Sequence, residues 1–300
     1  MNQPLVLVTG ATGKTGAPLV AQLRERGVPV RAFVRRLDER SARLEAHGAE
    51  VVRGDFLDLA SLRSALSEVD RAYFCYPPTR EDLVDATSLF AEAAREAGVR
   101  GVVNMSQISA LEASSSPLAR QHWLAEKVLD WADVGAIHIR PTFFSENLLI
   151  LGGGTIATEG RLYAPYGDEK HAPVAARDIA RVVANLLLDP EPHLGARLVL
   201  TGDQLRSMAE IAEVLSSELE RPVEYVDLSG EVWAQALAAI PTMTPSLIAH
   251  LRAVADEYKR GVFHARTDVV DRIGGAAPTP LAEFIREHRQ AFGAEASPAR

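Results

Sequence analysis

Short apolar runs alternate with longer stretches of helical periodicity from the start of the chain to Arg140. The runs are rich in valine and end in turn residues, which is typical of buried strands. The predicted strands cover residues 5–8, 28–34, 50–53, 72–75, 102–105 and 136–140. The predicted helices cover residues 41–47, 59–66, 80–97 and 117–132, besides one that follows the first strand. This alternation predicts an α/β fold in which helices cover both faces of a doubly wound parallel sheet.

The regular alternation of predicted strands and helices ends after Pro141. The pattern predicts a flexible connector at Gly152–Gly154, a helix over 177–188 and a strand over 197–200 that rejoins the sheet. Helices then dominate, with predicted ranges 208–219, 231–239 and 245–260 and a short strand at 223–226. We therefore expect a nucleotide-binding domain over 1–150, its sheet completed by 174–201. Residues 151–173 and 202–300 are expected to form a small, mainly helical C-terminal cap that binds substrate.

Three glycines spaced three apart follow the first strand directly. Gly10 permits a tight turn, Gly13 lets the backbone approach a pyrophosphate, and Gly16 lets the following helix pack on the strand. The amides at the start of that helix attract negative charge. Because the triplet lies between a predicted strand and a predicted helix, it indicates a Rossmann-type dinucleotide site rather than a simple turn.

The second predicted strand ends in two arginines, Arg35 and Arg36. In a unit that binds NAD, an acid usually stands at this point and bonds the ribose 2′-hydroxyl. Two guanidinium groups instead suit a 2′-phosphate, which they hold with charge-assisted bonds. The sequence therefore favours NADP(H) over NAD(H). The alternative is a basic turn that is merely solvated.

Composition narrows the class of protein. The chain has 300 residues, a net charge of −8 and an apolar fraction of 47%, as expected for a globular enzyme with a sizeable core. The acidic balance argues against nucleic acid as a partner, and no apolar stretch is long enough for a membrane span. The single Cys75 and an N-terminus that enters a strand directly lead us to expect a cytoplasmic protein without disulfides. No metal-ligand spacing is present, so no metal is expected.

The chain resembles the NmrA-like proteins, an atypical branch of the short-chain dehydrogenases/reductases. The resemblance is carried by the segments 9–16, 54–56, 118–129, 139–148 and 173–180, of which the third looks like the quinone-reductase members. It implies an extended Rossmann fold that binds NADP(H) and an NAD(P)H-dependent oxidoreductase. It also implies cofactor contacts by position, from Gly10, Thr12, Gly13, Lys14, Thr15, Arg35, Asp55, Phe56, Tyr76 and Pro77. For Phe56, ordinary core packing is an equal alternative.

The usual catalytic pair of the wider superfamily, a tyrosine and a lysine four residues later, is absent. Glu126 sets the register, which places His122 at the lysine position and Leu118 at the tyrosine position. Three candidates for catalysis remain: His122, which could also hold the nicotinamide ribose, Ser106 after the fifth strand, and Tyr76 after the fourth. A structural histidine, a turn-capping serine and a tyrosine whose pKa is not lowered are the alternatives.

The missing acid favours an acceptor that takes hydride easily, such as a quinone, enone, ketone or imine. Candidate residues for its apolar pocket, or equally for the core, are Phe143, Phe144, Tyr163, Trp233 and Met243. The leading hypothesis is an NADPH-dependent reductase. A non-catalytic regulatory protein that senses NADP(H) and binds a protein partner is the alternative, and an isomerase or lyase ranks third. The expected partners are an apolar small molecule and, for a homodimer, a second copy of the chain.

Overall fold

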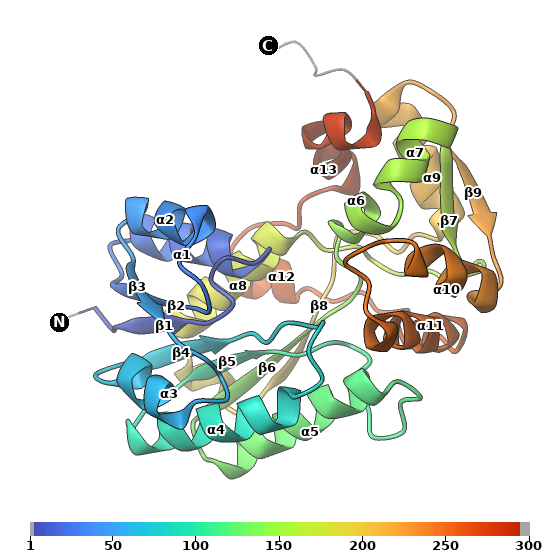
Figure 1. Ribbon diagram of the computed structural model, residues 1–300. Coiled ribbons are helices and arrows are strands. Elements are labelled where there is room, and N and C mark those ends of the chain that lie inside the picture. Colours follow the sequence, from blue (N-terminus) through green and yellow to red (C-terminus); the bar gives the residue numbers. More distant parts are fainter. Residues whose placement is uncertain (1–2, 295–300) are drawn as a thin grey trace.

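A parallel sheet forms the larger layer of the protein (Figure 1). The structure is a computed structural model and describes residues 3–294. Within them the sheet has seven strands in the order β3-β2-β1-β4-β5-β6-β8, and every neighbouring pair is parallel. The strands are β1 (Val6–Val8), β2 (Val30–Val34), β3 (Glu50–Arg53), β4 (Arg71–Phe74), β5 (Val102–Met105), β6 (Ala136–Pro141) and β8 (Arg197–Leu200).

Helices cover both faces of this sheet. One face carries α1 (Gly16–Glu25), α2 (Glu39–Ala46), α8 (Ala176–Leu188) and α12 (Val269–Gly274). The other carries α3 (Leu59–Leu66), α4 (Leu83–Glu96) and α5 (Pro117–Trp131). The strand order reverses between β1 and β4, so the crevice for a ligand lies at the carboxyl ends of these strands. The predicted doubly wound Rossmann-type fold is confirmed.

The second layer is a cap with its own apolar core. Strands β7 (Arg161–Ala164) and β9 (Glu224–Asp227) pair in parallel within it. Its helices are α6 (Asn147–Leu151), α7 (Gly153–Glu159), α9 (Met208–Leu219), α10 (Gly230–Ala238), α11 (Pro245–Lys259) and α13 (Leu281–Glu287). Two short 3₁₀ helices, Glu191–His193 and Arg289–Phe292, complete the described elements. None of the helices among residues 3–294 has the length and apolar character to cross a bilayer.

Local signals explain where several helices begin and end. The Asp38 carboxylate accepts from the amides of Arg40 and Ser41 at the start of α2, and Ser207 forms a reciprocal capping box with Glu210 at the start of α9. Gly98, at φ +75°, follows the end of α4 in the left-handed conformation that glycine favours. The ranges 50–53, 59–66, 102–105, 197–200 and 208–219 have the predicted bounds.

Three predictions about the later half need correction. The segment Gly152–Gly154 is not a flexible connector, because Gly152 joins α6 to α7 and the next two glycines begin α7. Strand β7 and helices α6, α7, α12 and α13 were not predicted. The predicted cap segment 202–300 also contains a helix of the other layer. Val269, Val270 and Ile273 of α12 belong to the core under the sheet, and Figure 1 shows α12 beside α8.

Candidate functional site

The loop between β1 and α1 has the geometry that its glycines predict. Gly10 adopts φ +59°, and a Cβ there would lie 3.1 Å from the carbonyl oxygen of Cys75. A Cβ on Gly16 would lie only 2.2 Å from the carbonyl oxygen of Gly10, closer than any side chain permits. The Gly13 amide donates to Gly10 O at 2.8 Å and closes the turn. Glycine is therefore required at the turn and at the helix–strand contact.

No side chain caps the N-terminus of α1. Thr15 stands at its N-cap position, yet its side chain makes no bond to the first turn. Its hydroxyl is instead 2.8 Å from the hydroxyl of buried Tyr73. Gly13 and Lys14 are exposed beside it and Thr12 is half-buried. The Ala17 amide donates to Gly13 O at 3.1 Å and Pro18 has no N–H, so the Gly16 amide and the helix dipole are what this end of α1 offers to an anion.

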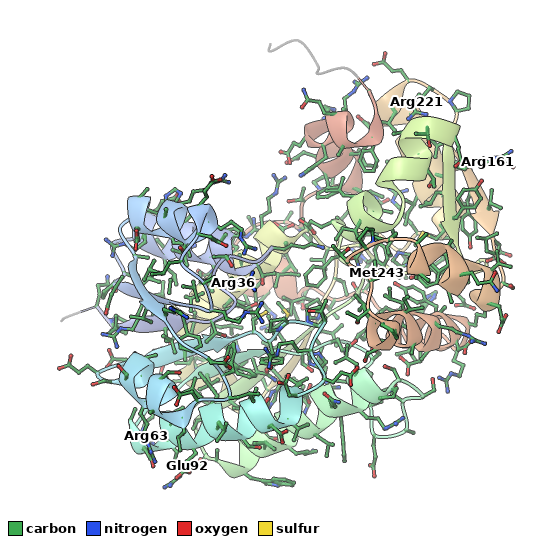
Figure 2. All side chains as sticks on the ribbon, in the orientation of Figure 1. Arg36, Arg63, Glu92, Arg161, Arg221 and Met243 are labelled. Atoms are coloured by element: carbon green, nitrogen blue, oxygen red, sulfur yellow. The ribbon has the colours of Figure 1, made fainter. Side chains whose placement is uncertain are left out.

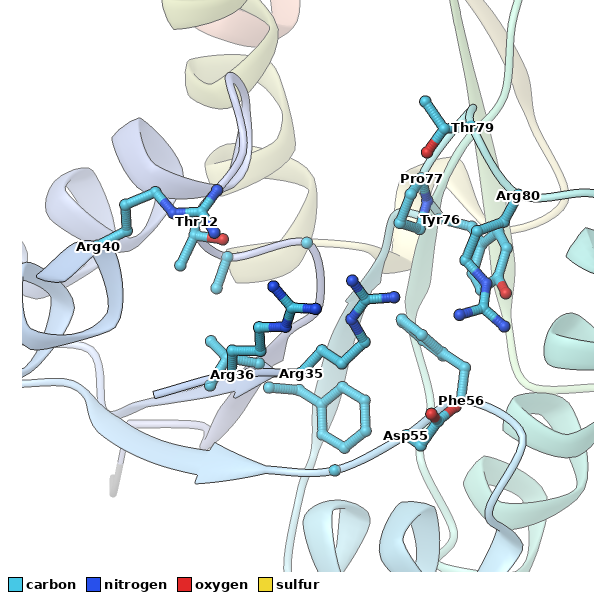
Figure 3. A pocket seen from close by; sticks show the side chains of 15 residues that line it. Thr12, Arg35, Arg36, Arg40, Asp55, Phe56, Tyr76, Pro77, Thr79 and Arg80 are labelled. Atoms are coloured by element: carbon cyan, nitrogen blue, oxygen red, sulfur yellow. The ribbon is translucent and has the colours of Figure 1, made fainter. Parts of the chain in front are cut away.

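A pocket of about 250 Å³ opens next to this loop, at the carboxyl ends of β1, β2 and β4 (Figure 3). It collects residues from four separate predicted segments: 10–12, 33–40, 54–56 and 76–80. Its lining consists of Gly10, Ala11, Thr12, Phe33, Val34, Arg35, Arg36, Arg40, Gly54, Asp55, Phe56, Tyr76, Pro77, Thr79 and Arg80. The structure therefore brings together most of the residues predicted to hold the cofactor.

The rim of this pocket is basic. Arg35 and Arg36 are exposed, and Figure 3 shows both guanidinium groups pointing into the space between Thr12 and Tyr76. Arg40, which was not predicted, lines the same side of the pocket, but its guanidinium group pairs with the Asp38 carboxylate at 2.7 Å. Because Asp38 caps α2 and binds Arg40, its carboxylate is occupied. The charge at the end of β2 thus suits a phosphate group.

Aromatic rings form the opposite wall. Phe56 is half-buried and meets Tyr76 edge-to-face, with centroids 5.1 Å apart, and it also packs on Phe33 and Phe74. Phe56 therefore lines the pocket and belongs to the core, so the two alternatives for it are not exclusive. Asp55 is exposed and accepts from the amide of Leu57 at 2.9 Å.

The hydroxyl of Tyr76 is hydrogen-bonded to a carboxylate and is not placed to act as an acid. It donates to Asp82 Oδ1 at 2.6 Å, and Arg80 binds the same carboxylate while lying 5.8 Å over the Tyr76 ring. Burial and the Asp82 carboxylate raise the pKa of Tyr76 well above its usual value. A proton donor would need a lowered pKa, so the environment of Tyr76 has the opposite effect.

Ser106 follows β5 and is 4% exposed. Its hydroxyl donates to Glu126 Oε1 at 2.6 Å. Glu126 is fully buried on α5 and also binds Arg140 at 2.6 Å and Arg197 at 3.0 Å. Burial alone would raise the pKa of Glu126, but the bonds from Arg140 and Ser106 keep it below its usual value. While Ser106 donates to this carboxylate, its oxygen can accept a hydrogen bond but cannot supply one.

His122 lies one turn before Glu126 on the same helix. Burial lowers the pKa of His122 to about 4, and His250 of α11 adds to the shift. Desolvation also lowers the pKa of the partly buried His250 to about 4, and its Nδ1 is 2.7 Å from the Ser116 hydroxyl. His122 is therefore uncharged near neutral pH. It can exchange hydrogen bonds there, but the imidazolium form that donates protons readily is scarce.

The five predicted substrate residues do not form one group. Phe143 and Trp233 are buried in the cap core, and both pack on Tyr166. Phe144 packs instead against the core of the sheet layer. Met243 lies at the edge of the cap that faces the sheet layer (Figure 2). Tyr163 is turned toward α7, where its hydroxyl donates to Glu159 at 2.8 Å.

Sequence reasoning missed Arg40, Thr79 and Arg80 of the pocket. Arg40 has a detectable signal, since it follows the N-cap Asp38 by two residues and so lies in the first turn of the helix after the arginine pair. Thr79 and Arg80 come from the irregular loop before α4, which begins at Leu83 and not at residue 80 as predicted.

Comparisons with known proteins agree with this geometry. NAD(P)H azoreductase from Xenophilus azovorans is 34% identical over 296 residues, 97% of this chain and 100% of that protein. The structure of the NADPH-dependent quinone oxidoreductase QOR2 from Escherichia coli complexed with NADPH has a TM-score of 0.82 and 26% identity, covering 95% of this chain and 99% of that one.

A third similar structure is that of NmrA, a negative transcriptional regulator, in complex with NADP. Its TM-score is 0.81 over 96% of this chain and 95% of that one, but at 18% identity the likeness concerns the fold alone. The sequence model of the NmrA-like family matches residues 2–285. Together with the glycine loop, the basic pocket and the parallel sheet, this match shows that the chain belongs to the NmrA-like family.

Proposed function

We propose that the protein uses NADPH to reduce a small, largely apolar acceptor: a quinone or azo compound first, and an enone, ketone or imine less readily. The protein is an NAD(P)H-dependent oxidoreductase, in keeping with relatives named azoreductase and quinone oxidoreductase, and its cofactor is NADP(H). One observation carries the proposal. The basic pocket at the end of β2 adjoins the uncapped start of α1.

The residues present fit this cofactor. The close contact of Gly16 with Gly10 lets α1 approach the strand, so that its N-terminus, which no side chain caps, faces the same crevice as the pocket. In the proposed arrangement Arg35 and Arg36 hold the 2′-phosphate, and Asp55 and Phe56 hold the adenine. Tyr76 and Pro77 contact the ribose nearest the nicotinamide. The pyrophosphate is held by the glycine loop and the residues that follow it: Gly10, Thr12, Gly13, Lys14 and Thr15. When bound, NADPH supplies the hydride.

The acid–base groups of this chain set the choice of acceptor. The Ser106 hydroxyl donates its proton to Glu126, so its oxygen can accept a hydrogen bond from a donor group of the ligand but cannot protonate the product. The uncharged His122 suits a hydrogen bond to the nicotinamide ribose. The hydroxyl of Tyr76 is held by Asp82. With no strong acid at these positions, an acceptor whose reduced form is a stable anion or takes its proton from water is favoured.

The substrate is proposed to lie between the carboxyl ends of β5 and β6 and the cap. Phe144 on the sheet side and Met243 on the cap side come from the two layers that would enclose it. Both side chains are only partly buried, so each leaves apolar surface for a ligand. Phe143 and Trp233 support this wall from within the cap core.

An acceptor panel tests the proposed class. NADPH consumption is followed with a quinone, an azo compound, an enone, a ketone and an imine of similar size, with NADH run in parallel. We expect kcat/KM for the quinone to exceed that for the ketone by at least about tenfold, because hydride transfer to a quinone leaves a weakly basic phenolate whereas transfer to a ketone leaves a strongly basic alkoxide that needs an acid. Turnover of the azo compound is expected from the relative named azoreductase. A ketone that is reduced faster than the quinone would contradict the reasoning from the missing acid.

A further inference from the structure

An aromatic cluster in the cap is organised around Tyr258 of α11. Tyr166 stacks on the Tyr258 ring with centroids 4.2 Å apart, and Phe263 stacks on it at 3.9 Å. At such short distances two parallel rings lie on opposite sides, so both faces of Tyr258 are covered. His171 is nearly perpendicular to Tyr258 at 5.1 Å and therefore meets its edge. Phe143 is tilted against the same imidazole at 5.0 Å.

This cluster contains three buried polar atoms without hydrogen bonds. His171 is fully buried and neither of its ring nitrogens has a partner, and the hydroxyl of Tyr258, which is 1% exposed, also has none. His171 is nevertheless firmly held, because its backbone exchanges hydrogen bonds with Arg206 at 3.0 and 2.8 Å. A buried donor left unpaired destabilises a fold, so such a group needs a water, a ligand or a functional reason.

Both side chains are uncharged. Burial lowers the pKa of His171 to about 3 and raises that of Tyr258 well above its usual value. The imidazole therefore offers one donor and one acceptor, and the phenol offers a further donor. A charged group placed there would lose its hydration without gaining an opposite charge. The chemistry of the cluster selects an uncharged hydrogen-bonding group carried on an aromatic or aliphatic body.

The cluster lies next to the proposed substrate region. Phe143 precedes Phe144 in the loop after β6, and the Thr142 hydroxyl donates to Ala172 O at 2.7 Å, which fixes the His171 segment to the end of that strand. Ile108, in the loop that begins at Ser106, packs in the same core. Met243 packs at the partly buried margin of this core, and a methionine repacks readily to admit a ligand.

We propose that His171 and Tyr258 form a recognition site for the carbonyl or hydroxyl oxygen of the acceptor. The proposal rests on the proposed function in placing the acceptor at the cap, and it adds that a bound acceptor is held through such an oxygen, which belongs to the reducible group of a quinone and is a substituent on an azo compound. The competing explanation is a buried water that satisfies the three atoms permanently. The two explanations differ in what removal of a polar atom does to stability.

Two variants test this, Tyr258→Phe and His171→Met, with Tyr225→Phe as the matched control. The Tyr225 hydroxyl is satisfied, since it donates to Ala164 O at 2.9 Å. Thermal unfolding is measured without ligand. Dissociation constants are measured by calorimetry for menadione, naphthol and naphthoate, and for NADPH. None of these readouts requires turnover, so a protein that binds menadione but does not reduce it would refute the proposed function and not this site.

We expect Tyr258→Phe and His171→Met to keep or raise the melting temperature, while Tyr225→Phe lowers it. The first two should weaken menadione and naphthol binding by about tenfold, the effect of one lost hydrogen bond to a buried polar group, and leave NADPH affinity unchanged. Naphthoate should bind the wild type at least about tenfold more weakly than naphthol, because the site excludes charge. Unchanged menadione affinity in both variants, or no binding of menadione and naphthol to the wild type, would overturn the proposal.

Discussion

Removing one arginine from the end of β2 is the sharpest test of how the cofactor is held. The side chains of Arg35 and Arg36 both enter the pocket from its basic rim, whereas Arg40 is engaged by Asp38. Arg35→Ala and Arg36→Ala therefore each remove a charge that is free to meet a 2′-phosphate. NADH has no such phosphate, so its affinity provides an internal control.

The size of the effect follows from exposure. A hydrogen bond to a charged group contributes about 1.5–3 kcal/mol. Both guanidinium groups are exposed, so solvent screening places the loss at the lower end of this range. A loss of about 1.5 kcal/mol weakens NADPH binding by roughly tenfold, and the double variant by roughly a hundredfold if the two effects add.

The assay is calorimetric titration of NADPH and NADH at fixed ionic strength. Arg63→Ala serves as the matched control because this exposed arginine pairs with Glu96 at the far side of the sheet layer (Figure 2). The variants at β2 should lose NADPH affinity, approach equal affinity for the two cofactors and show a weaker salt dependence. An unchanged NADPH dissociation constant, or an equal loss for NADH, would refute the assignment of these arginines.

Three further predictions concern the glycine loop and α5. Gly16→Ala forces a Cβ against a backbone oxygen, so we expect a lower melting temperature and loss of NADPH binding; Gly154→Ala, with no atom within 4 Å of the new Cβ, should be tolerated in both measurements. Glu126→Gln removes the fully buried charge that accepts the Ser106 hydrogen bond, and urea unfolding should show that the free energy of unfolding falls by about 3 kcal/mol. A fall of less than about 1 kcal/mol would contradict a stabilising role for this buried network. The pKa of His122 is lowered, so its folded form resists protonation and the stability it contributes is lost as the pH falls from about 6.5 toward 4. His122→Gln should reduce that loss in unfolding experiments, and a pH profile with the same slope in the variant would refute the assignment.

The sheet layer could be predicted from sequence because its signals are local. Each strand is a short apolar run, and Gly10 and Gly16 report a turn and a close contact that involve only neighbouring segments. The arginine pair of β2 is equally local, and the structure places both side chains at the predicted pocket. The requirement for Gly54 is different. A Cβ there would lie 2.3 Å from the Phe33 ring, which belongs to another strand.

The cap could be predicted only in part: the bounds of α9 and the approximate positions of β9, α10 and α11 were predicted, but the pairing of β9 with a second strand was not. Strand β7 pairs with β9, which is distant along the chain, and neither has a marked alternation that would identify its partner. The aromatic residues carry no sign of whether they line a pocket or fill the core, so Phe144 and Tyr163 face different surroundings from Trp233. His171 carried no sequence signal at all, because its significance lies in the absence of a partner for its two nitrogens.

The most direct test of the account is the stoichiometry of NADPH consumption by the purified wild-type protein with a simple quinone. We predict one NADPH oxidised for each quinone reduced to hydroquinone, with NADH used less efficiently because it lacks the phosphate that Arg35 and Arg36 bind. Tight NADPH binding without consumption, for quinones and azo compounds alike, would contradict the account and indicate a protein that senses NADP(H) instead of a reductase.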